Sequence, residues 1–534
     1  MTLSVSDHIA RRLAEAGCRW AFGVPGGEVL TLIDALERAG VRFVAARHEA
    51  AAGFMAEGTW HATGAPGVLV ATIGPGVANA INPVANAQQD RTPLIVITGC
   101  VDPADAQSYT HQVFDHGAAL APLVKARFLV AAGAGAAIAE KAVAAATAHP
   151  PGPVHIDLPV TVAASPEPAA PVARRPAPAL SRPADAALEA VGQALKQAKR
   201  PLVLVGLEAI THDAAAVVSE FVVRFGAPVI TTYKAKGVID EDNPICLGAA
   251  GLSPKADAIL LPLVQEADLI LLIGYDPIEM RAGWRHPFGA DQVVIELAGW
   301  RADHGMHRAD HLLIGDLRES LSALAEQAPS KRFWAATARN ALAAAFHPAE
   351  TWGPEAIIAT ARFVLPPETL ATVDSGAHRI LLSQIWRCPS PDGLLQSSGF
   401  CTMACALPLA IGAALAARDA NRPVVAFVGD GGLEMGLGEL ATLRDLGLPV
   451  IIVVFVDGSY ALIEMKQRAM QLPNAGVDLG ITDFASIAIA FGGHGVTVQS
   501  PAALEAALRT ALATRDRFTL IACPIDRRSY DGLL

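Results

Sequence analysis

The stretch Val424–Gly432 reads VVAFVGDGG, and it decides the fold that we predict for this chain. It opens with apolar residues that have the length and the β-branched content of a buried strand. It ends in Gly429-Asp430-Gly431-Gly432, and the helix-like residues 433–446 follow. A buried strand, a glycine-rich turn and a helix are the repeating unit of a parallel sheet covered by helices on both faces. We therefore expect an α/β fold in which Asp430 lies at the carboxyl edge of such a sheet.

The same alternation of strand-like and helix-like runs continues along the whole chain. Its 534 residues are too many for one core and suggest about three domains. The pattern predicts three doubly wound parallel-sheet domains, over residues 1–163, 185–328 and 352–534. Residues 164–184 are rich in proline, which is excluded from helix and sheet interiors, so we expect an extended linker there.

Short apolar runs are expected to form the strands of each domain. In the first domain one strand ends in Phe22–Gly27, and the others lie at residues 41–45, 68–72, 94–98 and 151–159. In the middle domain they lie at residues 201–205, 229–232, 269–274 and 293–297. In the third domain they lie at residues 370–374, 424–429, 450–456 and 518–523.

Composition and charge exclude several classes of function. Hydrophobic residues make up 52% of the chain, so it is not disordered, and the net charge of −11 argues against nucleic acid as a partner. The charge-free window Gly393–Ala417 contains glycine, proline and polar residues, which favour a buried helix over a membrane span. Asp7 comes early and no apolar core follows it, so we expect no secretory signal. The seven scattered cysteines form no CxxC pair, which fits reduced thiols and a cytoplasmic protein.

Two acidic residues follow neighbouring apolar runs of the third domain. Asp430 ends one strand, and the next strand ends in Asp457-Gly458-Ser459. In a parallel sheet these side chains meet at one edge, where two carboxylates and a loop carbonyl can bind Mg²⁺ that bridges to a diphosphate. The alternative is that Gly429–Gly432 is only a tight turn between a strand and a helix, and Asp457-Gly458 an ordinary turn.

The spacing favours the metal site, because here the chain resembles a known family. Gly429-Asp430-Gly431, then 25 residues, then Asp457 is similar to the cofactor signature of thiamine diphosphate-dependent enzymes. The chain looks like the acetolactate synthase (acetohydroxyacid synthase) and pyruvate oxidase group over essentially its whole length. Further motifs occur in family order, at Gly23–Gly27, Arg47–Glu49, Gly53–Glu57, Gly74–Gly76 with Asn79, Gly152–Pro159, Asp374–His378 and Thr402-Met403.

The resemblance implies a role for each domain and for the assembly. The first domain would bind the pyrimidine of thiamine diphosphate, the middle domain would be Rossmann-like, and the third would bind the diphosphate with Mg²⁺. The cofactor would lie between the first domain of one subunit and the third domain of another. A homodimer is therefore the smallest active unit expected, and a homotetramer is the other expectation.

The resemblance also implies roles for single residues. Glu49 would bind the ring nitrogen of the aminopyrimidine, so that the exocyclic nitrogen takes the proton from the thiazolium ring. Met403 would wedge between the two cofactor rings and keep them bent. Asn79 would lie near the pyrimidine, although it could instead cap a helix. The remaining cofactor-binding candidates are Gly26, Gly376, Ala377, His378, Gly429, Asp430, Gly431, Gly432, Asp457, Ser459, Tyr460 and Ala461, and the metal ligands are Asp430, Asp457 and the backbone carbonyl of Ser459.

The residues expected near the substrate depart from the family pattern. His111 and Gln112 are the catalytic candidates beside Glu49, with Gly26 and residues 461–466 nearby, and His111 replaces a phenylalanine. A histidine there could shuttle a proton at neutral pH, or it could be a histidine of a surface loop. Val456-Asp457 replaces an Asn-Asn pair, and Lys466 replaces a tryptophan of the biosynthetic enzymes. These departures weaken the expectation of a branched-chain biosynthetic role.

The middle domain leaves flavin binding open. It lacks a GxGxxG motif, yet its loops Gly274–Arg281 and Gly315-Asp316 follow predicted strands, where homologous domains hold FAD or ADP in some cases. Arg281 could pair with a phosphate or form a structural salt bridge.

The function predicted from the sequence is thiamine diphosphate- and Mg²⁺-dependent decarboxylation of a 2-keto acid, pyruvate, followed by carboligation to an acceptor carbonyl compound. The first alternative is a 2-keto acid decarboxylase that releases an aldehyde, of the benzoylformate or indolepyruvate type. The second is a paralogue with altered catalysis, which the changed Asn-Asn pair supports. A nucleotide-binding switch is disfavoured because no GxxxxGK[ST] loop is present.

Overall fold

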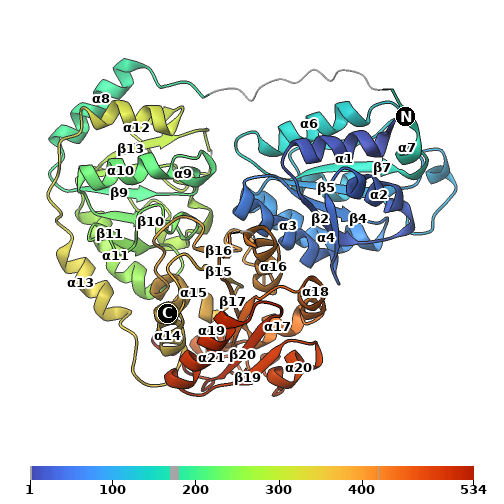
Figure 1. The fold of residues 1–534 in the computed structure, drawn as a ribbon. Coiled ribbons are helices and arrows are strands. Elements are labelled where there is room, and N and C mark those ends of the chain that lie inside the picture. The colour runs from blue at the N-terminus through green and yellow to red at the C-terminus, as the bar shows by residue number, and fades with distance from the viewer. Residues whose placement is uncertain (1–2, 169–179, 303, 419) are drawn as a thin grey trace.

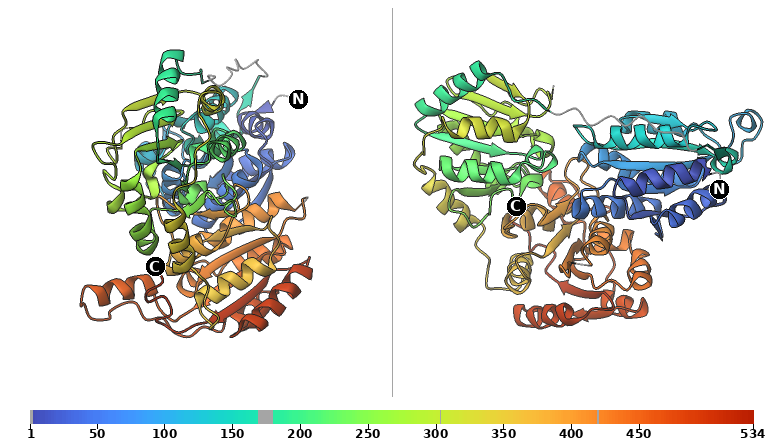
Figure 2. Two further views of the ribbon diagram at one scale, coloured as in Figure 1. Left: turned by 90° about the vertical axis from the view of Figure 1, so that its left-hand side faces the viewer. Right: turned by 45° about the horizontal axis from the view of Figure 1, so that its top comes forward.

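A computed structural model describes residues 3–168, 180–302, 304–418 and 420–534. They form three six-stranded parallel sheets, each with helices on both faces, and Figure 1 shows the three units arranged as a triangle. The right-hand view of Figure 2 separates the same three units, whereas in the left-hand view the middle domain overlaps the first. The predicted α/β class with three doubly wound domains is confirmed. The domain boundaries stay a prediction, because residues 169–179 of the predicted linker lie outside the described residues.

The first domain has the strand order β3-β2-β4-β5-β7-β6. Its strands are β2 (Trp20–Val24), β3 (Arg42–Ala45), β4 (Gly67–Ala71), β5 (Leu94–Cys100), β6 (Arg127–Leu129) and β7 (Val154–Pro159). Its helices are α1 (Val5–Glu15), α2 (Leu30–Arg38), α3 (Glu49–Thr63), α4 (Pro75–Gln89), α5 (His116–Leu120), α6 (Gly135–Thr147) and α7 (Val160–Ala164). Two short strands, β1 (Leu3–Ser4) and β8 (Pro166–Glu167), pair antiparallel, so the chain still contacts this domain beyond residue 163.

The middle domain has the order β11-β10-β9-β12-β13-β14, which is the order 3-2-1-4-5-6 of the Rossmann fold. Its strands are β9 (Pro201–Val205), β10 (Val229–Thr231), β11 (Cys246–Ala249), β12 (Leu269–Ile273), β13 (Val293–Ala298) and β14 (His311–Ile314). Its helices are α8 (Asp185–Gln197), α9 (Glu208–Thr211), α10 (Ala215–Phe225), α11 (Pro254–Glu266) and α12 (Leu317–Ala325). Helix α13 (Ala336–Ala345) follows the predicted end of this domain at residue 328, and its Leu342 joins the same core.

The third domain has the order β16-β15-β17-β18-β20-β19, the same winding as the first domain. Its strands are β15 (Leu370–Val373), β16 (Leu394–Gln396), β17 (Val424–Gly429), β18 (Ile451–Val456), β19 (His494–Thr497) and β20 (Thr519–Pro524). Its helices are α14 (Pro354–Val364), α15 (Ala377–Ile385), α16 (Ala406–Ala417), α17 (Asp430–Met435), α18 (Glu439–Leu446), α19 (Ala461–Ala469), α20 (Phe484–Ala490) and α21 (Pro501–Ala513).

The prediction of a single helix over residues 433–446 is wrong, because this segment forms two helices, α17 and α18. The break falls at Gly436–Gly438, and glycine is a poor helix former. It also makes room for the first domain, since a Cβ at Gly438 would lie 3.3 Å from the Cβ of Arg47.

The charge-free window Gly393–Ala417 contains β16 and the buried helix α16, as expected for a core element rather than a membrane span. Among the described residues, no helix is both long and apolar enough to cross a bilayer.

Helices α3 and α16 join the cores of the first and third domains. One continuous apolar cluster runs from the first sheet through α3, α4 and α16 to the third sheet. The two helices touch backbone to backbone: a Cβ at Gly412 would lie 1.9 Å from the carbonyl oxygen of Met55, and one at Gly58 would lie 2.3 Å from that of Leu409. Only glycine allows this approach. The contact fixes α3, whose first residue is Glu49, against the third domain.

All three domains meet at the buried carboxylate of Asp90. From the third domain, the backbone N–H groups of Ser398 and Gly399 donate to its two oxygens at 3.0 and 2.7 Å. From the middle domain, Lys234 Nζ lies 2.7 Å from Asp90 Oδ2. Because a buried charge is stable only when it is paired and hydrogen-bonded, these contacts hold the three domains in one arrangement.

Replacing Gly412 by alanine tests the helix contact. The added Cβ would force α3 and α16 apart, so we expect the free energy of unfolding to fall by about 3 kcal/mol. Urea unfolding of the full chain measures the change. Gly353→Ala is the matched control, because a Cβ at Gly353 meets nothing within 4 Å. Equal stability of the two variants would show that the helices do not touch as described.

Candidate functional site

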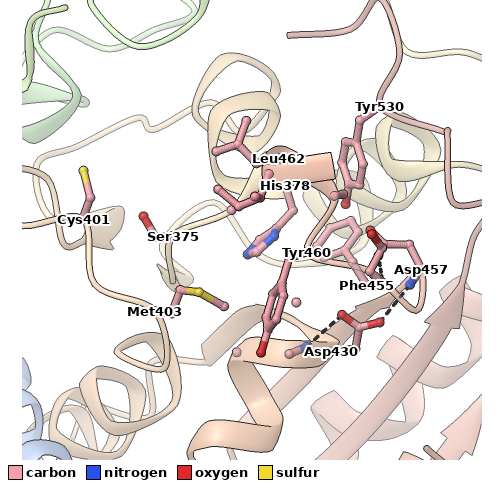
Figure 3. Close-up of a pocket in the computed structure, with 18 residues that line it drawn as sticks. Ser375, His378, Cys401, Met403, Asp430, Phe455, Asp457, Tyr460, Leu462 and Tyr530 are labelled. Atoms are coloured by element: carbon pink, nitrogen blue, oxygen red, sulfur yellow. Dashed lines mark hydrogen bonds between the residues drawn. The ribbon is translucent and has the colours of Figure 1, made fainter. Parts of the chain in front are cut away.

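A cavity of about 210 Å³ lies at the carboxyl ends of β15, β17 and β18 in the third domain. Figure 3 shows the side chains that line it. The structure brings together here all the site residues predicted in the third domain, namely Gly376, Ala377, His378, Met403, Gly429, Asp430, Gly431, Gly432, Asp457, Ser459, Tyr460 and Ala461. Their placement around one cavity is observed, and their roles toward a cofactor stay predictions.

Asp430 begins α17 directly after β17, and its carboxylate is held by the backbone. The N–H groups of Asp457 and Gly458 donate to Asp430 Oδ2 at 3.1 and 2.7 Å, and that of Gly431 donates to Oδ1 at 2.8 Å. Strands β17 and β18 pair in parallel up to Gly429 and Phe455, so their two tips lie side by side. The bonds from Asp430 then fix the turn that follows β18 against the turn that follows β17.

Asp457 is the second carboxylate at this edge. Its Oδ1 accepts the N–H of Ser459 at 2.9 Å. Burial, and then the negative charge of Asp430, raises the pKa of Asp457 to about 7. Burial also raises the pKa of Asp430. Asp430 is buried and Asp457 is half-buried, and carboxylates at neighbouring strand ends repel each other. A divalent cation with oxygen ligands relieves that repulsion.

Two buried hydroxyl groups line the same cavity and have no hydrogen-bond partner among the described residues. They are Ser459 Oγ and Tyr530 OH, on residues that are 5% and 2% exposed. Buried polar groups are ordinarily hydrogen-bonded, so unpaired donors in a cavity fit a ligand that carries acceptor oxygens. The oxygen ligands and these donors together fit a metal-bound diphosphate.

His378 and the loop around Met403 form the opposite wall. His378 is the second residue of α15, its Nε2 lies 2.8 Å from Asp374 Oδ1, and its ring stacks on Phe455 at 5.4 Å. Asp374 Oδ2 also accepts the N–H of Ala404 at 3.1 Å, which ties the Met403 loop to the end of β15. In Figure 3 Met403 is drawn below Ser375 and to the left of Tyr460.

The GDGG turn needs glycine for space. A Cβ at Gly431 would lie 2.6 Å from the ring of Tyr460, and one at Gly432 would lie 2.0 Å from Asp374 Oδ2. A Cβ at Gly376 would lie 2.5 Å from the ring of His378. The turn therefore lets the side chains of Tyr460 and Asp374 reach its backbone, and Gly376 leaves room for the ring of His378 in the same way.

The first domain brings Glu49 and Asn79 together. Glu49 is the first residue of α3 and is 6% exposed, and Asn79 Nδ2 donates to its Oε2 at 3.0 Å. Asn79 lies one turn into α4, after the Gly74-Pro75-Gly76 turn, and is itself exposed. A Cβ at Gly76 would lie 3.2 Å from Glu49 Oε1.

Gly26 and Gln112 also lie around the turn Gly74–Gly76. His111, in contrast, does not contact Glu49 or Asn79. Gly26 precedes α2, and a Cβ there would lie 2.3 Å from Thr72 Oγ1. Gln112 has a left-handed φ of 59°, and a Cβ at Gly74 would lie 2.6 Å from its carbonyl oxygen. His111 is exposed, and its ring meets that of Tyr109 at 6.2 Å. A catalytic role of His111 and Gln112 stays a prediction.

Sequence reasoning missed four residues that line the cavity: Ser375, Cys401, Phe455 and Tyr530. Ser375 could have been inferred from its place between Asp374 and Gly376, and Phe455 from its place at the end of a predicted strand. Tyr530 lies in the C-terminal segment after β20, far from any motif, and only the fold brings it here.

The two halves of the predicted site are separate in one chain. Among the described residues, the cavity is lined by the third domain alone, whereas Glu49 and Asn79 belong to the first.

The middle-domain loop Gly274–Arg281 follows β12 and contacts the first domain, where Arg91 Nε lies 3.1 Å from Asp276 Oδ2. Flavin binding at that loop stays an open prediction.

Three family models match the chain in order. Residues 3–119 match the N-terminal TPP binding domain of thiamine pyrophosphate enzymes, residues 188–324 match their central domain, and residues 374–523 match their C-terminal TPP binding domain. Thiamine pyrophosphate, or TPP, is another name for thiamine diphosphate. All residues that line the cavity lie within the third of these matches, except Tyr530.

Curated proteins of similar length align over nearly the whole chain. An acetolactate synthase of Bacillus subtilis is 30% identical, over 96% of this chain and 92% of its own. A catabolic acetolactate synthase of Raoultella terrigena is 29% identical, over 99% and 96%. A probable 2-ketoarginine decarboxylase of Pseudomonas aeruginosa is 30% identical, over 92% and 89%. With all three domains matched and relatives similar along their full length, the chain belongs to the family of thiamine diphosphate-dependent enzymes.

Proposed function

We propose that the protein uses thiamine diphosphate and Mg²⁺ to decarboxylate a 2-keto acid, pyruvate, and joins the remaining acyl unit to an acceptor carbonyl compound. One observation carries the proposal: Asp430 and Asp457 converge from adjacent strand ends on the cavity that the other predicted cofactor residues line. The relatives named acetolactate synthase support the reaction type.

The third domain would hold the metal and the diphosphate. Asp430, Asp457 and the backbone carbonyl of Ser459 would bind Mg²⁺, which prefers oxygen ligands. Asp457 stands where the family has asparagine, and its charge strengthens the attraction for a divalent cation. When bound, thiamine diphosphate supplies the carbanion stabilisation that decarboxylation requires. Gly376, Ala377 and His378 would face the diphosphate, Met403 would support the rings, and Gly429, Gly431, Gly432, Tyr460 and Ala461 would complete the wall.

The first domain would supply the acid–base group. Glu49 is buried, and its bond from Asn79 fixes one carboxyl oxygen, which leaves the other to hold a proton at the ring nitrogen of the aminopyrimidine. Gln112 adjoins the Gly74 turn beside this pair, which supports a place near the substrate. His111 is exposed, so as a proton shuttle it would act from the solvent side.

Release of an aldehyde is the second candidate reaction. A relative aligned over 92% of this chain is a probable 2-ketoarginine decarboxylase, so the family includes members named for decarboxylation alone. Both reactions need the same cofactor and the same Glu49. They differ in the last step: the acyl unit is joined to a carbonyl compound in the first reaction, and it is protonated and released as an aldehyde in the second.

We further propose a homodimer, or a homotetramer built from it, in which each site combines two chains. The cavity holds no first-domain residue among those described, and apolar side chains are exposed beside both halves. Ile463 and Met435 near the cavity are 47% and 57% exposed, and Leu30 and Ile81 in the first domain are 57% and 38% exposed. Exposed apolar patches mark contact surfaces, which supports a second copy as the partner.

A cytoplasmic location is part of the proposal. All seven cysteines are free thiols and six of them are buried, which fits a reducing compartment. The net charge of −11 supports small-molecule partners rather than nucleic acid.

Product analysis tests the reaction. With pyruvate, thiamine diphosphate and Mg²⁺, we expect release of CO₂ and formation of acetolactate, both measured by mass spectrometry, and we expect EDTA to abolish them. Acetaldehyde as the main product would favour the decarboxylase. Failure of the protein to bind the cofactor, or to turn over any compound of a 2-keto acid panel, would favour the paralogue with altered catalysis.

Glu49→Gln tests the acid–base role. The variant keeps the shape and the Asn79 contact but removes the ionisable group, so we expect kcat to fall about 100-fold or more. Glu57→Gln is the matched control, because Glu57 lies on the same helix, is buried, and accepts a bond from Asn86 at 2.8 Å. Steady-state kinetics and thermal unfolding of both variants separate catalysis from folding. Similar kcat values for the two variants would contradict the assignment.

Mixing two inactive variants tests the shared site. We expect Glu49→Gln and Asp430→Asn to be inactive alone, and their co-expressed mixture to regain about a quarter of the wild-type activity, because random pairing leaves one intact site in each mixed dimer. If each site lay within one chain, no intact site would form and the mixture would stay inactive.

A further inference from the structure

Tyr530 reaches the cavity from the end of the chain. It follows β20, is 2% exposed, and packs with Ala377 and Ala461, the first residues of α15 and α19. It lines the cavity, and Figure 3 shows its hydroxyl end directed toward Asp457 and Phe455. Its ring is therefore held in place by the first residues of α15 and α19, which also line the cavity.

The hydroxyl of Tyr530 is a buried donor without an acceptor. It has no hydrogen-bond partner among the described residues. A phenol is protonated at neutral pH, so the hydroxyl is available as a donor. An unpaired buried hydroxyl destabilises the fold, whereas phenylalanine would pack in the same place without that cost. The hydroxyl is thus better explained by a ligand than by packing.

Ion pairs keep this segment on α19. Arg468 of α19 binds Asp531 through two nitrogens at 2.6 and 2.9 Å, and it also binds Glu464 at 2.8 Å. The residue next to Tyr530 is thereby anchored to the helix that lines the cavity. The hydroxyl is presented by an ordered segment rather than by a loose chain end.

The charges at the site indicate what the hydroxyl binds. Asp430 and Asp457 repel a free anion, but a cation held between them attracts oxygen ligands to the same point. We propose that the Tyr530 hydroxyl donates a hydrogen bond to a metal-bound oxygen of the diphosphate group. This inference rests on the proposed function and adds a binding residue from the C-terminal segment.

Tyr530→Phe removes the hydroxyl and keeps the ring. In calorimetric titrations of the full chain with thiamine diphosphate at saturating Mg²⁺, we expect the affinity to fall about tenfold. Without cofactor, we expect the variant to melt at the same temperature as the wild type or higher, because an unpaired polar group is gone. An unchanged affinity would overturn the proposal, and so would a variant that melts earlier without cofactor or does not fold.

Tyr233→Phe is the matched control. Tyr233 is also buried, but its hydroxyl accepts the N–H of Ser253 at 3.1 Å and that of Gln384 Nε2 at 2.8 Å, within the protein. We expect this variant to melt earlier without cofactor and to keep the wild-type affinity. The two variants thus give opposite results if Tyr530 serves a ligand and Tyr233 serves the fold.

Two further titrations identify the acceptor. With Mg²⁺ alone, we expect Tyr530→Phe and the wild type to bind equally. An equal loss with Mg²⁺ alone and with the cofactor would place the bond on a metal-bound water and overturn the diphosphate assignment. If the wild type does not bind thiamine diphosphate, the proposed function is contradicted. If the wild type binds it and Tyr530→Phe binds it equally well, only the role of Tyr530 is contradicted.

Discussion

The carboxylate of Asp90 lies where the three domains meet, and it holds the loop that leads to the candidate site. It accepts N–H groups from Ser398 and Gly399 and pairs with Lys234, so each domain contributes to one buried cluster. Burying these charges is tolerable only while all of them are paired. The loop anchored in this way continues to Met403, which lines the cavity. The domain arrangement and the cavity wall therefore depend on the same contacts.

The interior strands could be predicted from the sequence, and most edge strands could not. Buried runs such as those of β5, β9, β12, β17 and β18 are continuously apolar because helices cover both of their faces. In the three six-stranded sheets, the strands that were not predicted are all edge strands, namely β6, β11, β14, β16 and β19. They are only three or four residues long, and several side chains in them are exposed. All five strands are too short for a clear apolar run, and β6, β14 and β19 also have exposed side chains that interrupt it.

Some residues of the candidate site could be predicted from the local sequence, whereas others are placed only by the overall fold. Asp430 and Asp457 could be paired in advance, since parallel strands that are neighbours in the sheet end at one edge. Tyr530 could not, because its place depends on how the chain folds back after β20. His111 shows that residue type alone does not identify a site residue. A histidine is suited to proton transfer, but this one lies on an exposed loop and does not reach Glu49 within one chain.

The shared core of the first and third domains has a consequence for how the protein comes apart. One apolar cluster spans both of these domains, whereas the middle domain packs mainly around two clusters of its own. Cooperative units follow buried apolar contacts rather than chain order. We therefore expect the first and third domains to melt as a single unit, although the middle domain separates them in sequence. The middle domain is joined to that unit through Lys234, which pairs with Asp90.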